Sequence, residues 1–231
     1  MKFNINDYKF IFFDFDGVIA DTEWQHYECL NEVLKPYSIK ISKQEYLEKY
    51  LAYDDKGCFK KVFKDKLSKE LTYKEVVGLI RKKTNLLMSK LKQNFRFYKD
   101  AIEFINYLKH NFPQVGLCIV SGALKKEIIF ILKKLKIFSS FVCIVSAEDV
   151  KNGKPSAEPF LVAKKFCEQK FKNKVSNNKI LVIEDSVNGI ISAKKASFKV
   201  LAVAHTYPLS KLKQANPDFI VRSLDELINN N

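Results

Sequence analysis

Short apolar runs alternate with amphipathic stretches along most of the chain, and this alternation predicts its secondary structure. Apolar runs closed by polar residues predict buried strands at 10–13, 115–120, 141–145, 179–183, 200–203 and 219–221. Stretches with helical spacing of apolar residues lie between or after them, at 100–110, 123–135, 156–171, 187–196 and 224–228. Strands and helices that alternate in this way form right-handed βαβ units. We therefore predict an α/β fold built on a Rossmann-like, doubly wound parallel sheet.

The segment 21–95 departs from this alternation, because its patterns are helical and none is a convincing strand. A first helix, capped by Thr22 or Asp21, ends before Pro36. Ser42 and Thr72 are each followed by a glutamate three residues later, which is capping-box spacing. Each is expected to begin a further helix. A further helical stretch covers 56–67. We predict a helical-bundle domain, residues 21–95, inserted after the first strand of a core made of residues 1–20 and 96–231.

The net charge and the cysteine content indicate which partners and which cellular compartment to expect. The chain has 231 residues, and 40 basic against 26 acidic side chains give a net charge of +14. The lysines are dispersed and no aromatic-interleaved or zinc-spaced motif accompanies them, so we expect a solvated basic surface that attracts anionic substrates and no nucleic-acid partner. Cys118 and Cys143 lie in strand-like runs and are expected in the core. Five cysteines without a C-x-x-C pair fit a reducing cytosol, which predicts a cytoplasmic protein.

The N-terminus lacks the apolar region of a signal peptide, and no run of 18 apolar residues occurs, so no membrane association is expected.

Candidate chemistry begins directly after the first predicted strand. Asp14 and Asp16 are separated by one residue, so on a strand both carboxylates point the same way. Two carboxylates this close repel each other unless a cation lies between them. Because ligands of such sheets bind beyond the carboxyl ends of the strands, we expect Asp14 and Asp16 to lie at the binding edge.

Three other predicted strands also end in polar groups, namely Ser121-Gly122, Gly153-Lys154-Pro155 after the short strand at 141, and Glu184-Asp185-Ser186. Taken alone, Ser121-Gly122 is more often a turn and Lys154-Pro155 more often a loop lysine, while Glu184-Asp185-Ser186 is as often a simple helix cap. In a doubly wound sheet, however, these ends converge on one crevice. Carboxylate oxygens suit a hard cation, of which Mg²⁺ is the expected one. A hydroxyl, Lys154 and a helix N-terminus near Ala123 suit a phosphate, so the combination predicts phosphoryl transfer.

Taken in order, four motifs resemble the haloacid dehalogenase superfamily, in the branch that contains β-phosphoglucomutase and phosphoglycolate-type phosphatases. They read D-F-D-G-V-x-x-D-T-E, S-G-A, G-K-P-S-x-E-P-F and I-E-D-S-V-N-G-I, and they span essentially the whole chain. The resemblance implies that Asp14 is the nucleophile, which forms an aspartyl phosphate. It implies that Asp16 is the general acid and base, and that its backbone carbonyl ligates Mg²⁺.

The same resemblance assigns the remaining site residues. Asp185 is expected to hold the metal together with Asp14, and Glu184 to ligate it directly or through water. The phosphoryl group is expected to be bound by residues from two motifs, Ser121, Gly122, Ala123 and Lys154. The chain departs from the family pattern at Ala157, Glu158, Ala196-Ser197 and Lys99-Asp100, none of which removes a catalytic group. Ser197, which stands where glycine is usual, is expected to strain a helix C-terminus.

The inserted helical domain resembles the family's cap, which closes over the site and carries substrate choice. His26 aligns with a hinge histidine that in the mutase times the acid–base step; the alternative is a hinge histidine without that role. The segment 51–57 contains Asp54 and Asp55 where a mutase uses an arginine for a second phosphate.

We therefore predict a monomeric Mg²⁺-dependent phosphatase of a small phosphomonoester, such as a sugar phosphate or phosphoglycolate, with a sugar-phosphate mutase as the alternative. A non-enzymatic phospho-accepting module is a third alternative, but that class lacks the inserted domain and the second aspartate.

Overall fold

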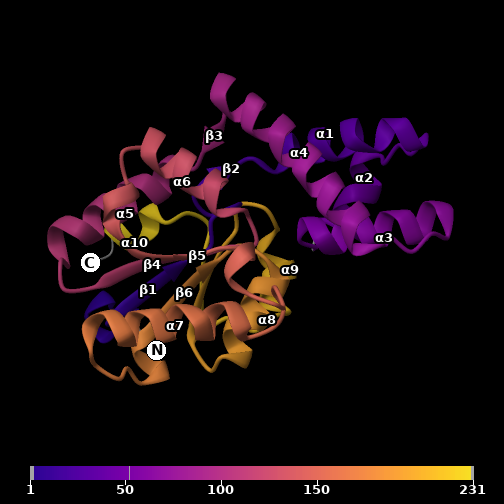
Figure 1. Cartoon of the computed structure of the whole chain (residues 1–231). Helices are drawn as coiled ribbons and strands as arrows, with labels where there is room; N and C mark the ends of the chain where they lie inside the picture. Colours follow the sequence, from indigo (N-terminus) through magenta and orange to yellow (C-terminus); the bar gives the residue numbers. More distant parts are fainter. Residues whose placement is uncertain (1–2, 52, 230–231) are drawn as a thin grey trace. The chain divides into compact units, whose positions relative to one another are not determined.

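The structure is a computed structural model that describes residues 3–51 and 53–229 (Figure 1). The chain divides into two compact units. The first is formed by Met1–Asp21 together with Phe97–Asn231, and the second by Thr22–Arg96. None of the helices in the described part of the chain has the length and apolar composition that crossing a bilayer requires.

The first unit is built on a six-stranded sheet with the strand order β5-β4-β1-β6-β7-β8. Its strands are β1 (Phe10–Phe13), β4 (Gly116–Val120), β5 (Phe141–Val145), β6 (Ile180–Glu184), β7 (Lys199–Val203) and β8 (Phe219–Val221). All neighbouring strands are parallel, and Phe10 of β1 is level with Gly116 on one side and Ile180 on the other. The predicted Rossmann-like parallel sheet is confirmed.

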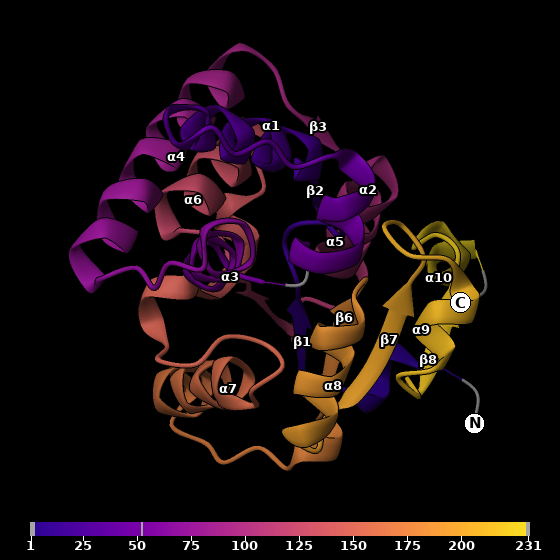
Figure 2. The same ribbon diagram turned by 90° about the vertical axis from the view of Figure 1, so that its right-hand side faces the viewer.

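Helices cover both faces of this sheet (Figures 1 and 2). They are α5 (Lys99–Asn111), α6 (Lys125–Lys134), α7 (Glu158–Phe171), α8 (Val187–Lys195), α9 (Leu209–Lys213) and α10 (Asp225–Asn229). Phe10 and Phe12 of β1 pack in one core cluster with Phe160 of α7 and Ile190 of α8. Phe13 lies on the opposite face, where its ring contacts that of Phe104 of α5. With both faces covered, the strands are continuous apolar runs, as in other parallel sheets.

Two predicted helix starts were early by two residues. The helix expected from Ala123 begins at Lys125, because Leu124 has an extended backbone. The Glu127 side chain folds back and accepts a hydrogen bond from the Leu124 N–H. The helix expected from Ser156 begins at Glu158, and the Ser156 hydroxyl accepts from the Glu158 N–H.

A two-stranded sheet of β2 (Ala20–Asp21) and β3 (Arg96–Phe97) was not predicted, because two-residue strands have no periodicity. Asp21 therefore lies in a strand rather than at a helix start.

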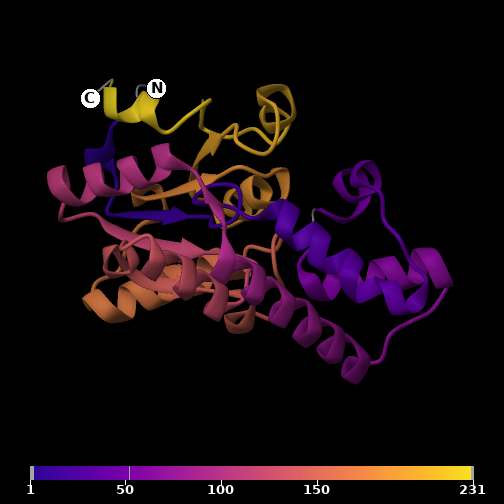
Figure 3. The same ribbon diagram turned by 90° about the horizontal axis from the view of Figure 1, so that it is seen from above.

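Among the described residues of the second unit, the regular secondary structure is helical apart from Arg96, which belongs to β3. It contains α1 (Glu23–Leu34), α2 (Lys43–Glu45) continued by a π-helical turn (Tyr46–Tyr50), α3 (Asp55–Leu67) and α4 (Tyr73–Gln93). Helices α1 and α4 lie side by side (Figure 3). The capping box at the start of α4 is present, since Thr72 Oγ1 accepts from the Glu75 N–H and the Glu75 carboxylate accepts from the Thr72 N–H at 2.8 Å.

Ser197, at the end of α8, adopts a φ of 60°, in the left-handed region that favours glycine. An L side chain costs roughly 1–2 kcal/mol in this region. Replacement by glycine removes that cost but also raises the entropy of the unfolded chain, which offsets part of the gain. We therefore expect Ser197→Gly to raise the free energy of unfolding by about 0.5–1 kcal/mol. Urea unfolding would measure the change. Ser176→Gly is the matched control, because Ser176 has a φ of −68° and its replacement is expected to destabilise. Equal effects of the two substitutions would contradict the strain at Ser197.

Candidate active site

The centre of the candidate site is Asp14, which directly follows β1 in the middle of the sheet. Its backbone N–H donates to the Ile183 carbonyl of β6 at 2.9 Å, so the strand pairing continues through the aspartate and fixes its position. The residue is only 8% exposed. A buried carboxylate requires charged or hydrogen-bonding partners, and the neighbouring strand ends supply them.

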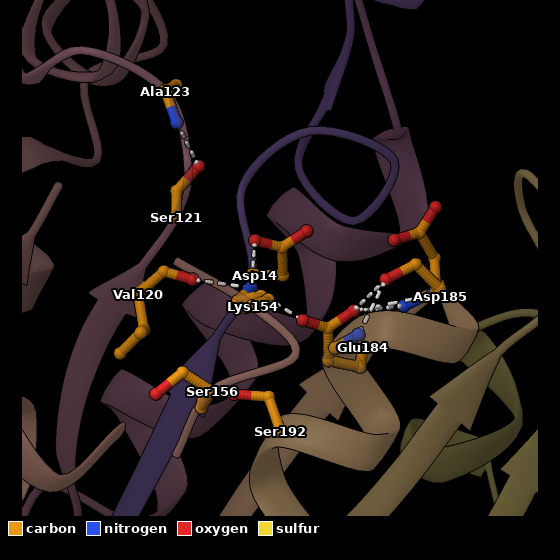
Figure 4. Close-up of polar contacts among 11 residues, drawn as sticks. Asp14, Val120, Ser121, Ala123, Lys154, Ser156, Glu184, Asp185 and Ser192 are labelled. Atoms are coloured by element: carbon orange, nitrogen blue, oxygen red, sulfur yellow. Dashed lines mark hydrogen bonds and ion pairs between the residues drawn. The ribbon is translucent and has the colours of Figure 1, made fainter. Parts of the chain in front are cut away.

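Lys154, in the loop between β5 and α7, is the main partner of Asp14. Its ammonium donates to Asp14 Oδ1 at 2.6 Å, to Glu184 Oε1 at 2.5 Å and to the Val120 carbonyl at 2.9 Å (Figure 4). All three of its protons therefore have an acceptor. Burial opposes the charged form, but the carboxylates of Asp14 and Glu184 more than compensate and raise the pKa of Lys154 above its usual value. Lys154 is thus a fixed cation between two strand ends.

Glu184 and Asp185 complete the acidic part of the site at the end of β6. The Glu184 side chain is fully buried, and its Oε2 accepts from the Ser186 hydroxyl at 3.0 Å and the Asp185 N–H at 3.2 Å. Burial raises the pKa of Glu184 to about 7. The positive charge of Lys154 acts against this shift, and the negative charge of Asp14 adds to it. Burial, together with the negative charges of Asp14 and Glu184, raises the pKa of Asp185. Both shifts reflect mainly the burial of the two carboxyl groups, to which the neighbouring negative charges add.

Oxygen atoms of Asp14, Glu184 and Asp185 all lie within 4.8 Å of one another. When all three carboxyl groups are ionised, they and the Lys154 ammonium sum to −3 + 1 = −2, a charge that one divalent cation balances. The donors are all hard oxygen atoms, which is the ligand type that Mg²⁺ prefers. The residues present therefore fit the expected magnesium ion, which Asp14 and Asp185 would hold with Glu184 beside them.

The predicted phosphate-binding segment follows β4. Ser121 is buried, its N–H donates to the Val145 carbonyl, and its hydroxyl accepts from the Ala123 N–H at 3.0 Å. Gly122 at the tip of this turn is exposed. Figure 4 shows Asp14 and Lys154 lying between Val120–Ser121 on one side and Glu184–Asp185 on the other. The strand order β4-β1-β6 explains this convergence of segments that are distant in the sequence.

Asp16 and Gly17 lie in the turn after Asp14. Asp16 is not one of the three carboxylates whose oxygen atoms lie within 4.8 Å of one another, and its predicted role at the site stays a prediction. Gly17 has a φ of 81°, and a Cβ at this position would overlap the Asp185 carboxylate and approach the Thr206 hydroxyl. The glycine therefore allows the turn to pass close to the end of β6.

A hydrogen-bonded histidine supports this turn and was missed from the sequence. His205 Nδ1 lies 3.0 Å from the Gly17 carbonyl, and Nε2 lies 3.0 Å from Asp100 Oδ2. Both partners are hydrogen-bond acceptors, so the imidazole ring links the turn at Gly17 to Asp100 at the start of α5. Burial opposes ionisation of Asp100, but hydrogen bonds from His205, the Leu224 N–H and Ser223 lower its pKa to about 2. His205 follows β7, so its place after a strand could have identified it.

His26 belongs to the second unit, where its Nδ1 accepts from the Lys83 ammonium at 2.9 Å. Lys83 is buried and also forms an ion pair with Asp55. Burial and the charge of Lys83 lower the pKa of His26 to about 3, so the ring is neutral near pH 7. His26 is therefore an internal acceptor of the helical unit, and its predicted role toward a substrate stays a prediction.

The model of the haloacid dehalogenase-like hydrolase family matches residues 11–203. The Bacillus subtilis protein YhcW, which is named as a phosphatase, is 29% identical over 84% of this chain and 83% of its own length. The phosphorylated carbohydrates phosphatase of Thermotoga maritima is 22% identical over 85% of each chain. Among solved structures, β-phosphoglucomutase from Clostridium difficile superposes with a TM-score of 0.80 at 23% identity, over 95% of this chain and 93% of the other.

These matches confirm the predicted resemblance and the predicted enzyme class, a phosphoric monoester hydrolase. The matched residues extend from β1 to the end of β7 and therefore include all the strand ends that carry the candidate site. The chain belongs to the haloacid dehalogenase-like hydrolase family.

Proposed function

We propose that the chain is a Mg²⁺-dependent phosphatase that hydrolyses a small phosphomonoester, such as a sugar phosphate or phosphoglycolate, through an aspartyl-phosphate intermediate. The observation that supports this most strongly is the charge arrangement around Asp14. Its carboxylate is held by Lys154 and lies beside Glu184 and Asp185. A nucleophile held at a fixed position next to a cation-binding group is what attack on a phosphate requires.

The proposed reaction has two steps. An oxygen of the Asp14 carboxylate attacks phosphorus, the bond from phosphorus to the ester oxygen breaks, and Asp16 gives that oxygen a proton. Asp16 then takes a proton from water, whose oxygen attacks phosphorus and releases phosphate and the Asp14 carboxylate. Lys154 stays in place and, with Ser121 and the N–H groups of Gly122 and Ala123, balances the charge of the phosphoryl group. Bound Mg²⁺ supplies the positive charge that lets a phosphate dianion approach the carboxylates.

We also propose that the unit Thr22–Arg96 is the cap and the other unit the catalytic core. In the second unit the buried Lys83 is already paired with Asp55, at the segment where a mutase would bind a second phosphate. An acidic residue there disfavours a bisphosphate, so this pair favours hydrolysis over the mutase alternative. The cytoplasmic location, the monomeric state and the absence of a nucleic-acid partner stay predictions.

A screen of phosphomonoesters with the purified chain tests the proposal. We expect phosphate release with Mg²⁺ and its loss in EDTA, with small sugar phosphates and phosphoglycolate among the best substrates. The same reactions, analysed for isomerised sugar phosphate, separate a phosphatase from a mutase. Isomerisation without phosphate release, or equal phosphate release in EDTA, would contradict the proposal.

A further inference from the structure

Three cysteines that are far apart in the sequence meet in the first unit. They are Cys118 in β4, Cys143 in β5 and Cys167 in α7. Their sulfur atoms all lie within 4.8 Å of one another, and the Sγ atoms of Cys118 and Cys167 are 3.3 Å apart. All three are free thiols. The proposed phosphatase reaction uses none of them.

A β-bulge creates this meeting. Leu117 is level with Phe141, but the next residue of β4, Cys118, is level with Cys143, so Val142 is an extra residue in β5. Without that residue, Cys143 would be shifted by one position relative to Cys118. Because successive side chains of a strand point to opposite faces, the Cys143 side chain would then point to the other face of the sheet. Bulges are frequent where a side chain has to be re-aimed at a site. Lys170 of α7 binds the bulge, because its ammonium donates to the Val142 carbonyl at 2.9 Å.

The surroundings of the three sulfur atoms are apolar. Cys118 and Cys167 belong to a core cluster that also contains Phe160 and Ala163 of α7, and Cys143 packs against it. No histidine, aspartate or glutamate in the described ranges joins the three cysteines within the same distance. The donor set is therefore sulfur alone, which disfavours hard cations and favours soft ones.

We propose that Cys118, Cys143 and Cys167 form a three-sulfur site that binds a soft monovalent metal ion, Cu(I). Structural zinc takes four protein ligands in nearly all cases, and the described part of the chain offers three here. Iron–sulfur clusters likewise need four ligands. Thiolates are the ligands that select Cu(I). The proposal does not depend on the phosphatase reaction, because the site uses other residues on another part of the sheet.

Binding is a ligand exchange without electron transfer. Cu(I) replaces the protons of two thiols, which pass to solvent, and the third thiol coordinates without losing its proton. Two thiolates and one Cu(I) leave a charge of −2 + 1 = −1. The Lys170 ammonium, fixed on the neighbouring Val142 carbonyl, offsets that charge. Cys143 provides the entry point, because it is half-buried on the edge strand β5 while the other two thiols are buried.

The test is a titration of the reduced full-length chain with Cu(I) in the presence of bathocuproine disulfonate as a competing chelator. We expect one Cu(I) per chain by native mass spectrometry, and sulfur as the only neighbour in the X-ray absorption spectrum. Cys143→Ala and Cys167→Ala are each expected to weaken binding by more than the roughly 10–100-fold that loss of an outer-shell partner costs a metal site. Cys29→Ala is the matched control, a buried cysteine outside the trio that is expected to keep full affinity.

Circular dichroism of each variant without metal separates loss of the site from loss of the fold, and Cys143→Ala on the edge strand is the variant expected to fold best. Equal Cu(I) affinity of the wild type and this folded variant would overturn the proposal. Tighter binding of Zn²⁺ than of Cu(I), or retention of Cu(I) by a chain with all three cysteines replaced, would overturn it as well. None of these outcomes requires phosphatase activity, so failure of the proposed function would be recognised separately.

Discussion

Asp14→Asn is expected to abolish phosphate release, with a loss in kcat on the order of 10⁴-fold or more, as is typical when a catalytic nucleophile is removed. An amide is a far weaker nucleophile than a carboxylate and forms no stable phosphoryl adduct. The substitution keeps the shape of the side chain, and the amide oxygen can still accept the hydrogen bond that Lys154 now gives to Oδ1 at 2.6 Å. Release of phosphate from p-nitrophenyl phosphate under saturating Mg²⁺ measures the effect.

The stability of Asp14→Asn is the control that separates chemistry from folding. When the carboxyl groups are ionised and no metal is bound, the substitution changes the charge of the cluster formed by Asp14, Glu184, Asp185 and Lys154 from −2 to −1, so it relieves repulsion between buried carboxylates. We therefore expect its free energy of unfolding in EDTA to be no lower than that of the wild type. Asp7→Asn, at an exposed position, is the matched variant that should keep full activity. Near-normal turnover by folded Asp14→Asn would exclude the aspartyl-phosphate mechanism.

The parts of the site that could be predicted from the sequence are those carried by short segments at strand ends. Asp14, Lys154 and Glu184 each follow or close an apolar run, and the parallel order of the strands is enough to bring such ends together. Their direct contacts, in which one lysine joins two carboxylates, also depend on the loop after β5, which brings Lys154 to Asp14 and Glu184.

Other features depend on contacts that no local pattern encodes. The hydrogen bond between His205 and Asp100 joins residues 105 positions apart, and only the tertiary fold brings the loop after β7 to the start of α5. The cysteine trio depends on one extra residue in β5, which shifts the register. An apolar run such as 141–145 looks the same with or without a bulge. Ser197, in contrast, was identified from the missing glycine, and its positive φ is the left-handed backbone on which the predicted strain depends.

Lys154→Met is expected to reduce both stability and activity. In EDTA the variant would leave the carboxylates of Asp14, Glu184 and Asp185 without their counter-charge, and breaking a buried ion pair from one side costs roughly 3–5 kcal/mol. Methionine matches the length of the lysine stem, so the loss reports the charge rather than a cavity. Phosphate release is expected to fall about 10²–10³-fold, as when one donor to a transition-state charge is removed. Chemical denaturation in EDTA and steady-state kinetics in Mg²⁺ measure the two effects.

The pH dependence gives this prediction a specific sign. The pKa of Glu184 is raised to about 7 in the folded chain, above its ordinary value of 4.5, so the folded state binds the proton more tightly than the unfolded state. Stability in EDTA therefore falls as pH rises from about 4.5 to about 7. Removing the Lys154 ammonium raises the pKa of Glu184 further, so the deficit of Lys154→Met grows with pH and Mg²⁺ restores part of it. Lys165→Met, an exposed lysine of α7, is the control. A deficit that is constant from pH 5 to pH 8, or equal in both variants, would show that Lys154 does not hold these carboxylates together.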